Sequence, residues 1–265
     1  MRLHNKFRLT LTGSLRDFIG RDNMHADFPR LITWMLRGEE FAPDLLRSWG
    51  IAISAEPVFQ YEGELEEDAM CNLFRIRAAP AEIAGLFRAT LTSDATWKDD
   101  IYPRYDAPVI IAHEGERRLG LMRWGFPTEV QGATKKITKH VTNARNLGSS
   151  FWRSSVANAS RRCLVPFTQF AEPKPGKDAA GRPAQHWFTI TDQPIACFAG
   201  LWRPTESGPA FAFCTTEPNP LIAPLHPKAM PVVLMPGDHD RWLTGTAEDA
   251  LALQAPYPSQ LMAVA

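Results

Sequence analysis

The sequence predicts an α+β domain whose core is a mainly antiparallel β structure with a few flanking helices. Two observations lead to this prediction. Short apolar runs, broken by Pro and Gly, recur along most of the chain, and only isolated segments between them show helical spacing. Strands that follow one another without a regular crossover helix pair mostly in antiparallel fashion, because parallel neighbours need long connections.

The expected strands are seven apolar runs in the second part of the chain. They are Val109–Ala112, Leu119–Trp124, Cys163–Phe167, Trp187–Ile190, Ala196–Trp202, Phe211–Thr215 and Pro231–Met235. The segment 174–183 is rich in Pro, Gly and Lys, so we expect a polar loop there.

Two helices are expected beside these strands. Pro80 opens the first, because proline is favoured in the first turn of a helix. Its apolar face is formed by Ile83, Leu86, Phe87 and Leu91. Thr246 is the expected N-cap of the second, which continues to Gln254.

Composition describes an ordinary globular protein and excludes several classes. The 265 residues carry 29 Lys+Arg and 29 Asp+Glu, a formal net charge of zero. No stretch approaches the ~18 apolar residues of a membrane helix, and the first residues lack the apolar core of a signal peptide. Four cysteines without a CxxC pair indicate a reducing cytoplasm rather than a disulfide framework or a zinc site. We therefore expect a cytoplasmic protein with no metal and no other cofactor.

The zero net charge hides a division of the chain at Met70. Residues 1–70 hold 8 Lys+Arg and 12 Asp+Glu, a net charge of −4, so the rest of the chain carries +4. This asymmetry indicates an N-terminal extension, residues 1–69, and a main domain, residues 70–265. Chance variation along one domain explains the charges about equally well. The whole-chain charge argues against a nucleic-acid partner, whereas the +4 domain mildly favours one.

Cys71 is the candidate nucleophile because it directly follows Met70. A Met before a small side chain is what a chain start looks like, and an N-terminal cysteine has a free amine beside its thiol. Both groups are partly deprotonated near neutral pH. The amine can form a Schiff base with an aldehyde, and the nearby thiol can then close a five-membered thiazolidine. From residue type alone, the alternative is a small buried side chain at the start of a strand.

Three further segments carry polar residues near the ends of expected strands. Asn143 and Arg145 place an amide and a guanidinium two residues apart. Glu172 follows an apolar run, and His226 and Lys228 precede the last expected strand. Taken singly, each has a plain alternative as a turn asparagine, a solvated carboxylate or a surface histidine.

Eight short motifs occur in order along residues 70–265. They are Met70-Cys71, Tyr105–Pro108, Trp124-Gly125-Phe126, Asn143-Ala144-Arg145, Arg162–Pro166, Phe170-Ala171-Glu172, Phe198–Trp202 and His226–Pro231. The ordered set resembles the SRAP family, the SOS response-associated peptidases or abasic-site processing proteins. Each motif is weak by itself, but the ordered set is specific, and none of it falls in residues 1–69. The resemblance implies a barrel-like β core.

The resemblance also implies a covalent reaction with DNA. Cys71, freed by autocatalytic removal of Met70, would attack the ring-opened aldehyde of an abasic site in single-stranded DNA and end as a thiazolidine. Asn143 would position the cysteine, and Glu172 would act as general acid and base in both reactions. His226 would hydrogen-bond the sugar hydroxyl and shuttle protons. The implied partner is single-stranded DNA with abasic sites, bound by a monomer that joins the nucleoid during the response to DNA damage.

The resemblance assigns further residues to DNA binding. Arg145 would contact a phosphate beside the lesion, and Trp124 would stack on or wedge against a base. The common Cys-Gly-Arg-Phe pattern is absent after Cys71, so we expect Arg75 or Arg77 to supply the missing contact. Lys228 is the nearest basic residue in the histidine loop. A Trp often follows the catalytic Glu in the family, but Pro173 stands at that position here.

The position of Cys71 conflicts with this chemistry, because 69 residues precede Met70 and an internal cysteine has no free amine. Residues 1–69 are then a mis-assigned start, a leader removed by a protease, or a sign that crosslinking has been lost. We favour a mis-assigned start, because the resemblance begins abruptly at Met70. Two other functions stay open: a cysteine hydrolase of the N-terminal-nucleophile type, and a non-catalytic single-stranded DNA-binding module.

Overall fold

A ring of five strands forms the centre of the computed structural model, which describes residues 72–92, 96–131 and 135–265. Around the ring the order is β13, β12, β9, β4 and β5, and β5 closes it through a parallel pairing with β13. The other pairings in the ring are antiparallel. The strands are β4 (Asp106–His113), β5 (Glu116–Trp124), β9 (Arg162–Phe167), β12 (Ala196–Thr205) and β13 (Gly208–Thr216). The predicted α+β class with a barrel-like, mainly antiparallel core is confirmed.

Aromatic side chains fill the core of this barrel. Phe198 stacks on Phe167 with a ring-centroid distance of 3.9 Å and lies 4.8 Å from Phe213. Phe74 meets Phe198 edge-on at 5.8 Å and Trp124 at 5.2 Å. All five rings are fully buried. Paired aromatic rings bury large apolar areas and prefer such offset or edge-to-face arrangements, so this cluster holds the strands together.

A second sheet continues from the barrel where β9 ends. Its strand order is β15, β11, β10, β1 and β3. Their bounds are β1 (Leu73–Arg75), β3 (Asp100–Ile101), β10 (Gln169–Lys177), β11 (Pro183–Ile190) and β15 (Met262–Val264). Leu73 in β1 pairs with Ala171 in β10, so the first described residues lie beside the middle of β10.

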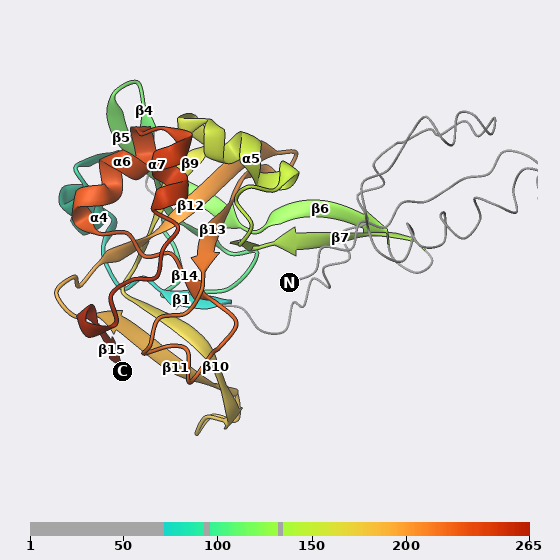
Figure 1. Ribbon diagram of the computed structural model, residues 1–265, viewed down its shortest axis with the longest axis vertical. Coiled ribbons are helices and arrows are strands. Elements are labelled where there is room, and N and C mark those ends of the chain that lie inside the picture. Colours follow the sequence, from blue (N-terminus) through green and yellow to red (C-terminus); the bar gives the residue numbers. More distant parts are fainter. Residues whose placement is uncertain (1–71, 93–95, 132–134) are drawn as a thin grey trace, which may run out of the picture. The chain divides into compact units, whose positions relative to one another are not determined.

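Shorter elements surround these sheets. The strands are β2 (Ala89–Leu91), β6 (Phe126–Gln131), β7 (Lys136–Val141), β8 (Asn143–Ala144) and β14 (Met230–Pro231). The helices are α4 (Pro80–Phe87), α5 (Ser150–Ala157), α6 (His239–Thr244) and α7 (Ala247–Ala252), with short 3-10 turns at Ala159–Arg161, Pro236–Asp238 and Ser259–Leu261. Figure 1 shows the β6–β7 hairpin projecting from the barrel, and α5, α6 and α7 grouped at one end.

The first predicted helix is correct at its start and wrong at its end. Helix α4 stops at Phe87 because Arg88 adopts the left-handed conformation, with φ of 51°, and its N–H bonds to the last turn. Leu91 therefore lies in β2 rather than on the helix face. Ile83 and Phe87 are buried, whereas Leu86 is 58% exposed.

The second predicted helix has the expected cap. The hydroxyl of Thr246 accepts a hydrogen bond from the backbone N–H of Asp249, and the Asp249 carboxylate accepts one from the N–H of Thr246. This reciprocal capping box satisfies two of the N–H groups that a helix start leaves unpaired. The helix, α7, ends at Ala252, two residues before the predicted end.

Six of the seven predicted strands lie in β4, β5, β9, β11, β12 and β13, but the run Pro231–Met235 does not form a continuous strand. Only Met230–Pro231 forms β14. The next residue, Val232, accepts a hydrogen bond from the N–H of Ala199 and donates one to the carbonyl of Cys214. The segment lies between β12 and β13 and divides its hydrogen bonds between them, so no regular ladder forms with either.

The predicted polar loop at 174–183 is shorter than expected and covers only residues 178–182. Strand β10 continues to Lys177, and β11 begins at Pro183, which pairs with Lys177. The register shifts between Pro173 and Lys177, and a bulge of this kind accommodates the Pro and Gly residues that prompted the loop prediction. Asp178 closes the connection by accepting hydrogen bonds from two backbone N–H groups of the turn.

Candidate active site

Glu172 lies in the middle of β10 and is completely buried. Burial raises the pKa of its carboxyl group well above the usual range, because the charged form is poorly solvated there. Neither carboxyl oxygen has a hydrogen-bond partner among the described residues. The solvated strand end is therefore excluded, and Glu172 has the environment of a carboxyl group that holds a proton.

His226 lies beside this carboxyl group and is also buried. Its Nδ1 is 2.8 Å from the carbonyl oxygen of Ala229 and 3.4 Å from Oε2 of Glu172. A carbonyl only accepts, so Nδ1 carries the proton and donates it to Ala229. In the neutral ring, Nε2 is then the basic nitrogen. The alternative of an exposed surface histidine is wrong.

Asn143 begins β8, which pairs in parallel with β13 through Asn143 and Phe213. Its Nδ2 donates to the hydroxyl of Thr142 at 3.0 Å, whereas its Oδ1 is buried without a hydrogen-bond partner among the described residues. Strand β13 runs between β8 and the Met230–Val233 segment that follows His226. Asn143 and the histidine loop thus lie on the two sides of β13.

Thr215 on β13 is a further buried polar residue, which sequence reasoning missed. It follows Phe213 by two residues, so its side chain lies on the same face as that of Asn143. Thr215 is 1% exposed, and its Oγ1 has no hydrogen-bond partner in the described part of the chain. Buried polar atoms are nearly always paired, so the unpaired oxygens of Glu172, Asn143 and Thr215 are candidates for contact with a polar ligand.

Cys71, the predicted nucleophile, lies outside the described residues, as do Met70 and the proposed extension of residues 1–69. The first described residue, Asn72, is exposed and directly precedes β1. Because Leu73 pairs with Ala171, β1 begins next to the residue that precedes Glu172.

Three predicted DNA-binding residues are exposed. Arg145 follows β8, and its guanidinium is 3.9 Å from the carboxylate of Glu217, with both groups in contact with solvent. Lys228 is exposed in the histidine loop. Arg77 is exposed and lies 3.5 Å from Asp99. Exposed pairs of this kind are weak and leave both arginines able to bind a phosphate.

Arg75 is held by internal contacts instead. Its Nε donates to Asp100 at 2.6 Å, its Nη1 donates to Gln169 at 3.2 Å, and its guanidinium lies 3.5 Å over the ring of Trp187. Of the two arginines considered as substitutes for the missing family contact, Arg77 is therefore the better placed.

The expected stacking role of Trp124 is incompatible with its position. The indole is 0% exposed in the barrel core, and its Nε1 donates to the carbonyl of Thr142 at 3.0 Å. Trp124 thus supports the backbone that leads into Asn143 and presents no surface to a base. Arg162 is likewise buried and donates to the carbonyls of Val156 and Trp242, so it is structural as well.

A comparison with family models identifies the family of this chain. The model for the SOS response associated peptidase (SRAP) family matches residues 70–265. The chain belongs to the SRAP family. The match begins at Met70, at the division that the charge distribution indicates, and a search of curated proteins found no match.

Solved structures share the SRAP fold of this chain. A protein from Bordetella bronchiseptica is 24% identical with a TM-score of 0.59, covering 74% of this chain and 98% of its own. A protein from Bacteroides thetaiotaomicron is 18% identical with a TM-score of 0.58, covering 73% and 90%. A phage-related protein from B. bronchiseptica is 19% identical with a TM-score of 0.54, covering 74% and 93%. At these identities the likeness concerns the fold alone.

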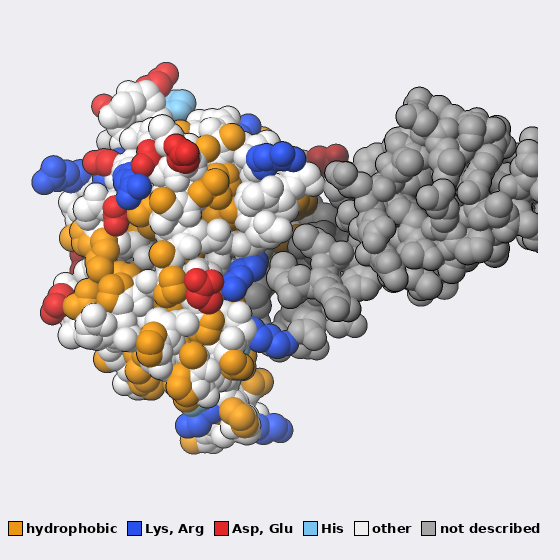
Figure 2. Space-filling model, viewed as in Figure 1, with side chains coloured by type: hydrophobic (Ala, Val, Ile, Leu, Met, Phe, Trp, Pro, Cys, Tyr) orange, Lys and Arg blue, Asp and Glu red, His pale blue; other side chains and the backbone are white. Residues whose placement is uncertain are grey.

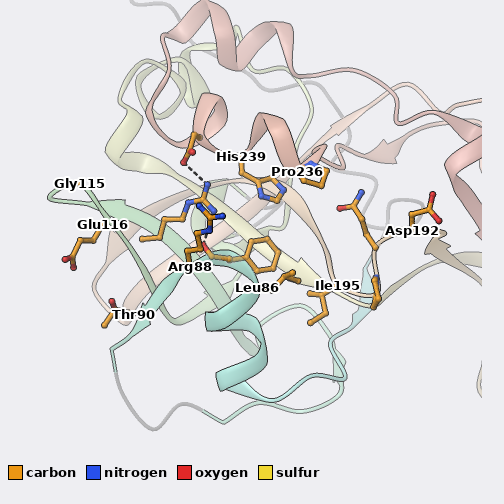
Figure 3. A pocket seen from close by; sticks show the side chains of 14 residues that line it. Leu86, Arg88, Thr90, Gly115, Glu116, Asp192, Ile195, Pro236 and His239 are labelled. Carbon is orange, nitrogen blue, oxygen red and sulfur yellow. Dashed lines mark hydrogen bonds and ion pairs between the residues drawn. The ribbon is translucent and has the colours of Figure 1, made fainter.

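A pocket of about 840 Å³ lies away from the candidate residues of this SRAP domain (Figure 3). At its wall, Nε2 of His239 is 3.2 Å from the sulfur of buried Cys197. Burial lowers the pKa of His239 to about 4 and raises that of the Cys197 thiol. Both groups are neutral at pH 7, with the thiol donating to the imidazole, so they do not form an activated thiolate.

Charge is unevenly distributed over the surface. Figure 2 shows acidic side chains gathered over α6 and α7, where Asp240, Glu248 and Asp249 lie in the first turns. Arg117 pairs with Asp240 and Arg241 with Asp249, so this end of the SRAP domain carries charges of both signs. Among the described residues there is no cluster of His, Cys, Asp and Glu that could hold a metal ion, and no helix is long and apolar enough to cross a membrane.

Proposed function

We propose that this SRAP protein binds single-stranded DNA and forms a covalent thiazolidine with abasic sites through Cys71 once that residue is N-terminal. The single observation that carries the proposal is the buried Glu172–His226 pair, 3.4 Å apart, at the residues that the family resemblance names as acid/base and proton shuttle. The reaction would protect abasic sites in the response to DNA damage.

Chain connectivity supports a role for Cys71 beside this pair. Two residues of extended chain span at most about 7 Å, so the Cα of Cys71 lies within that distance of the Cα of Leu73. Leu73 pairs with Ala171, the neighbour of Glu172. A nucleophile two positions before Leu73 would therefore be close enough to β10 to act together with Glu172.

The proposed reaction has two covalent steps. The amine of Cys71 adds to the aldehyde carbon of the ring-opened sugar, and the carbinolamine loses its hydroxyl group as water to give an imine. The thiol then adds to the imine carbon, its proton moves to the nitrogen, and the thiazolidine ring closes. Neither step needs an oxidant, a reductant or a metal.

Glu172 would supply the proton on which the first step depends. Loss of hydroxide from the carbinolamine is slow unless the oxygen is protonated, and burial raises the pKa of Glu172, which favours the protonated form that can donate. In a chain that begins at Met70, the same group would assist cleavage of the Met70–Cys71 bond. This self-processing would be the peptidase activity in this chain.

The neighbouring polar groups would hold the sugar in place. His226 would hydrogen-bond the sugar hydroxyl and return protons to Glu172. The unpaired Oδ1 of Asn143 would accept a hydrogen bond from the Cys71 amine or the crosslink, and Thr215 offers an unpaired hydroxyl on the same strand face. Such preorganised groups cost no rearrangement at the moment of reaction.

Phosphates on either side of the lesion would be bound by exposed cations. An abasic site has no base to recognise, so binding depends on the backbone and on flanking bases. Arg145, Lys228 and Arg77 are exposed and would supply these contacts.

The experiment compares two forms of the protein, the 265-residue chain and a chain that begins at Met70. Each is incubated with single-stranded DNA that carries one abasic site, and covalent product is measured on denaturing gels. We expect a product only from the shorter chain, and none from its Cys71→Ala variant. Reversible binding without any covalent product would favour a non-catalytic binding module, and turnover of amides without DNA binding would favour a cysteine hydrolase.

A further inference from the structure

The β6–β7 hairpin projects from the barrel as a two-stranded arm (Figure 1). We define the arm as residues 126–131 and 135–141. Its base is fixed, because the ring of Phe126 is buried against Trp152 at 5.4 Å and the Arg203 guanidinium lies 4.4 Å above it. The outer pairs, from Thr128–Lys139 to Gln131–Lys136, extend beyond this base.

The arm carries an excess of positive charge. It contains three lysines and one carboxylate. The lysines are Lys135, Lys136 and Lys139, and the carboxylate is that of Glu129. Lys136 is 3.2 Å from Glu129, but both side chains are about 70% exposed and the pair is weak. Lys135 and Lys139 make no ion pair within the described part of the chain. Two lysines of the arm are therefore available to an anionic partner.

One face of the arm also offers apolar contact. Val130 pairs with Ile137, and Lys139 lies on the same face two residues further along β7. Ile137 is 39% exposed. A two-stranded hairpin is only marginally stable by itself, and its own stability does not explain why Ile137 is exposed near its outer end. Single-stranded nucleic acids bind where cations follow the backbone and apolar side chains, most often aromatic ones, contact the bases, and here an aliphatic Ile137 would take the second part.

The arm leads directly into the candidate active site. Strand β7 ends at Val141, and Thr142 connects it to Asn143. Asn143 is the fourth residue after Lys139, a distance of at most about 14 Å, which a few nucleotides of a single strand can span. A strand whose abasic sugar lies at Glu172 and His226 can therefore follow the arm outward.

We propose that the arm binds the undamaged part of the DNA strand that flanks the abasic site, with Lys135 and Lys139 on phosphates and Ile137 against a base. This inference rests on the proposed function for the identity of the partner. It assigns the arm to holding the strand and not to the covalent chemistry, which belongs to the buried pair.

The test uses the full 265-residue chain and an undamaged fluorescent strand of about 12 nucleotides, with affinity measured by anisotropy at several salt concentrations. The variant Lys135→Ala/Lys139→Ala removes two cations without breaking an ion pair of the described structure. We expect binding weaker by roughly 20-fold at about 0.1 M salt, and a salt slope smaller by about 1.4. Ile137→Ser is expected to weaken binding roughly fivefold with an unchanged slope.

The matched control is Lys174→Ala/Lys177→Ala, which removes the same charge from exposed positions on the β10–β11 hairpin. The proposal is overturned if the arm variant binds like the unchanged protein, if the control loses as much affinity as the arm variant, or if the unchanged protein does not bind the strand. These outcomes are distinct from failure of the proposed function, which is the absence of a Cys71-dependent covalent product. The unfolding temperatures of all variants are compared. If Lys135→Ala/Lys139→Ala alone loses both folding and affinity, the Ile137→Ser variant decides the question, because it is expected to weaken binding with an unchanged salt slope.

Discussion

Oε2 of Glu172 lies 3.4 Å from Nδ1 of His226, and both side chains are buried where the second sheet meets the barrel. The imidazole Nδ1–H is donated to the carbonyl of Ala229, so the carboxyl group receives little stabilisation for its charged form. Because burial raises the pKa of Glu172, this carboxyl group is a proton donor that lies beside the imidazole of His226. The predictions below follow from this pair and from the residues around it.

Glu172→Gln is expected to stabilise the folded chain at neutral pH. The folded-state pKa of Glu172 is raised, so the folded protein holds a proton that the unfolded chain releases above about pH 4.3. The stability of the unchanged protein therefore falls as pH rises from that value towards the raised pKa, by up to about 1.4 kcal/mol per pH unit. Denaturant unfolding between about pH 4 and pH 8 measures the difference, which is expected to vanish at the acidic end. A constant difference at all pH values would contradict the raised pKa.

The same Glu172→Gln change is expected to leave Met70 attached in a chain that begins at Met70. Gln has nearly the shape of Glu but cannot donate and accept the proton that bond cleavage needs. Intact-mass spectrometry reads the result directly, with the unchanged chain as the control that loses Met70. Complete Met removal in the variant would exclude the processing role of Glu172.

Thr215→Val is expected to slow crosslinking without loss of stability. The hydroxyl has no hydrogen-bond partner among the described residues, so replacing it by a methyl group of similar size removes an unsatisfied buried polar atom. We expect stability to be unchanged or higher by about 1 kcal/mol and the crosslinking rate to fall roughly tenfold. Single-turnover crosslinking and thermal unfolding measure the two effects. A destabilised variant with an unchanged rate would assign Thr215 to the core alone.

Arg145→Ala is expected to weaken DNA binding, whereas Arg75→Ala is expected to lower the stability of the fold. Arg145 is exposed, so its loss should weaken binding to single strands of every sequence and lower the salt slope by about 0.7. Arg75 bonds to Asp100 and Gln169, so its loss should destabilise the fold by about 1–3 kcal/mol and leave the salt slope unchanged. Anisotropy titrations and denaturant unfolding on both variants distinguish the two roles. A smaller slope for Arg75→Ala would show that it contacts DNA.

Trp124→Phe is expected to lower stability and not DNA affinity. The indole is fully buried, and the change removes its hydrogen bond to Thr142 and part of its contact in the core. We expect a loss of about 1–3 kcal/mol in unfolding free energy. Affinity for an undamaged single strand should be unchanged at a temperature where the variant is folded. A large loss of affinity at unchanged stability would restore the stacking role.

Much of the fold could be predicted because apolar runs in this chain coincide with buried strands. The failures have physical causes. Leu91 has helical spacing, but the left-handed Arg88 ends α4 before it. The segment at 174–183 has loop composition, but a bulge allows Pro and Gly within β10. Local sequence does not reveal which strand a segment will pair with, and strand pairing determined the structure of both segments.

The candidate site was predictable in part. The motif order along the chain identified Glu172, His226 and Asn143, and the structure brings the first two into contact. The motif order could not show that Trp124 points into the core, because a Trp-Gly-Phe motif is compatible with either face of a strand. Thr215 and the basic arm carry no motif, and their relevance follows from an unpaired hydroxyl and from the projection of a hairpin.

The most direct test of the account is the reaction of the chain that begins at Met70 with single-stranded DNA bearing one abasic site, followed by intact-mass spectrometry of the adduct. The account predicts loss of Met70 and one adduct whose mass equals protein plus DNA minus one water, resistant to heat and absent in Cys71→Ala. Recovery of unmodified protein and DNA, or an adduct that persists in Cys71→Ala, would contradict it.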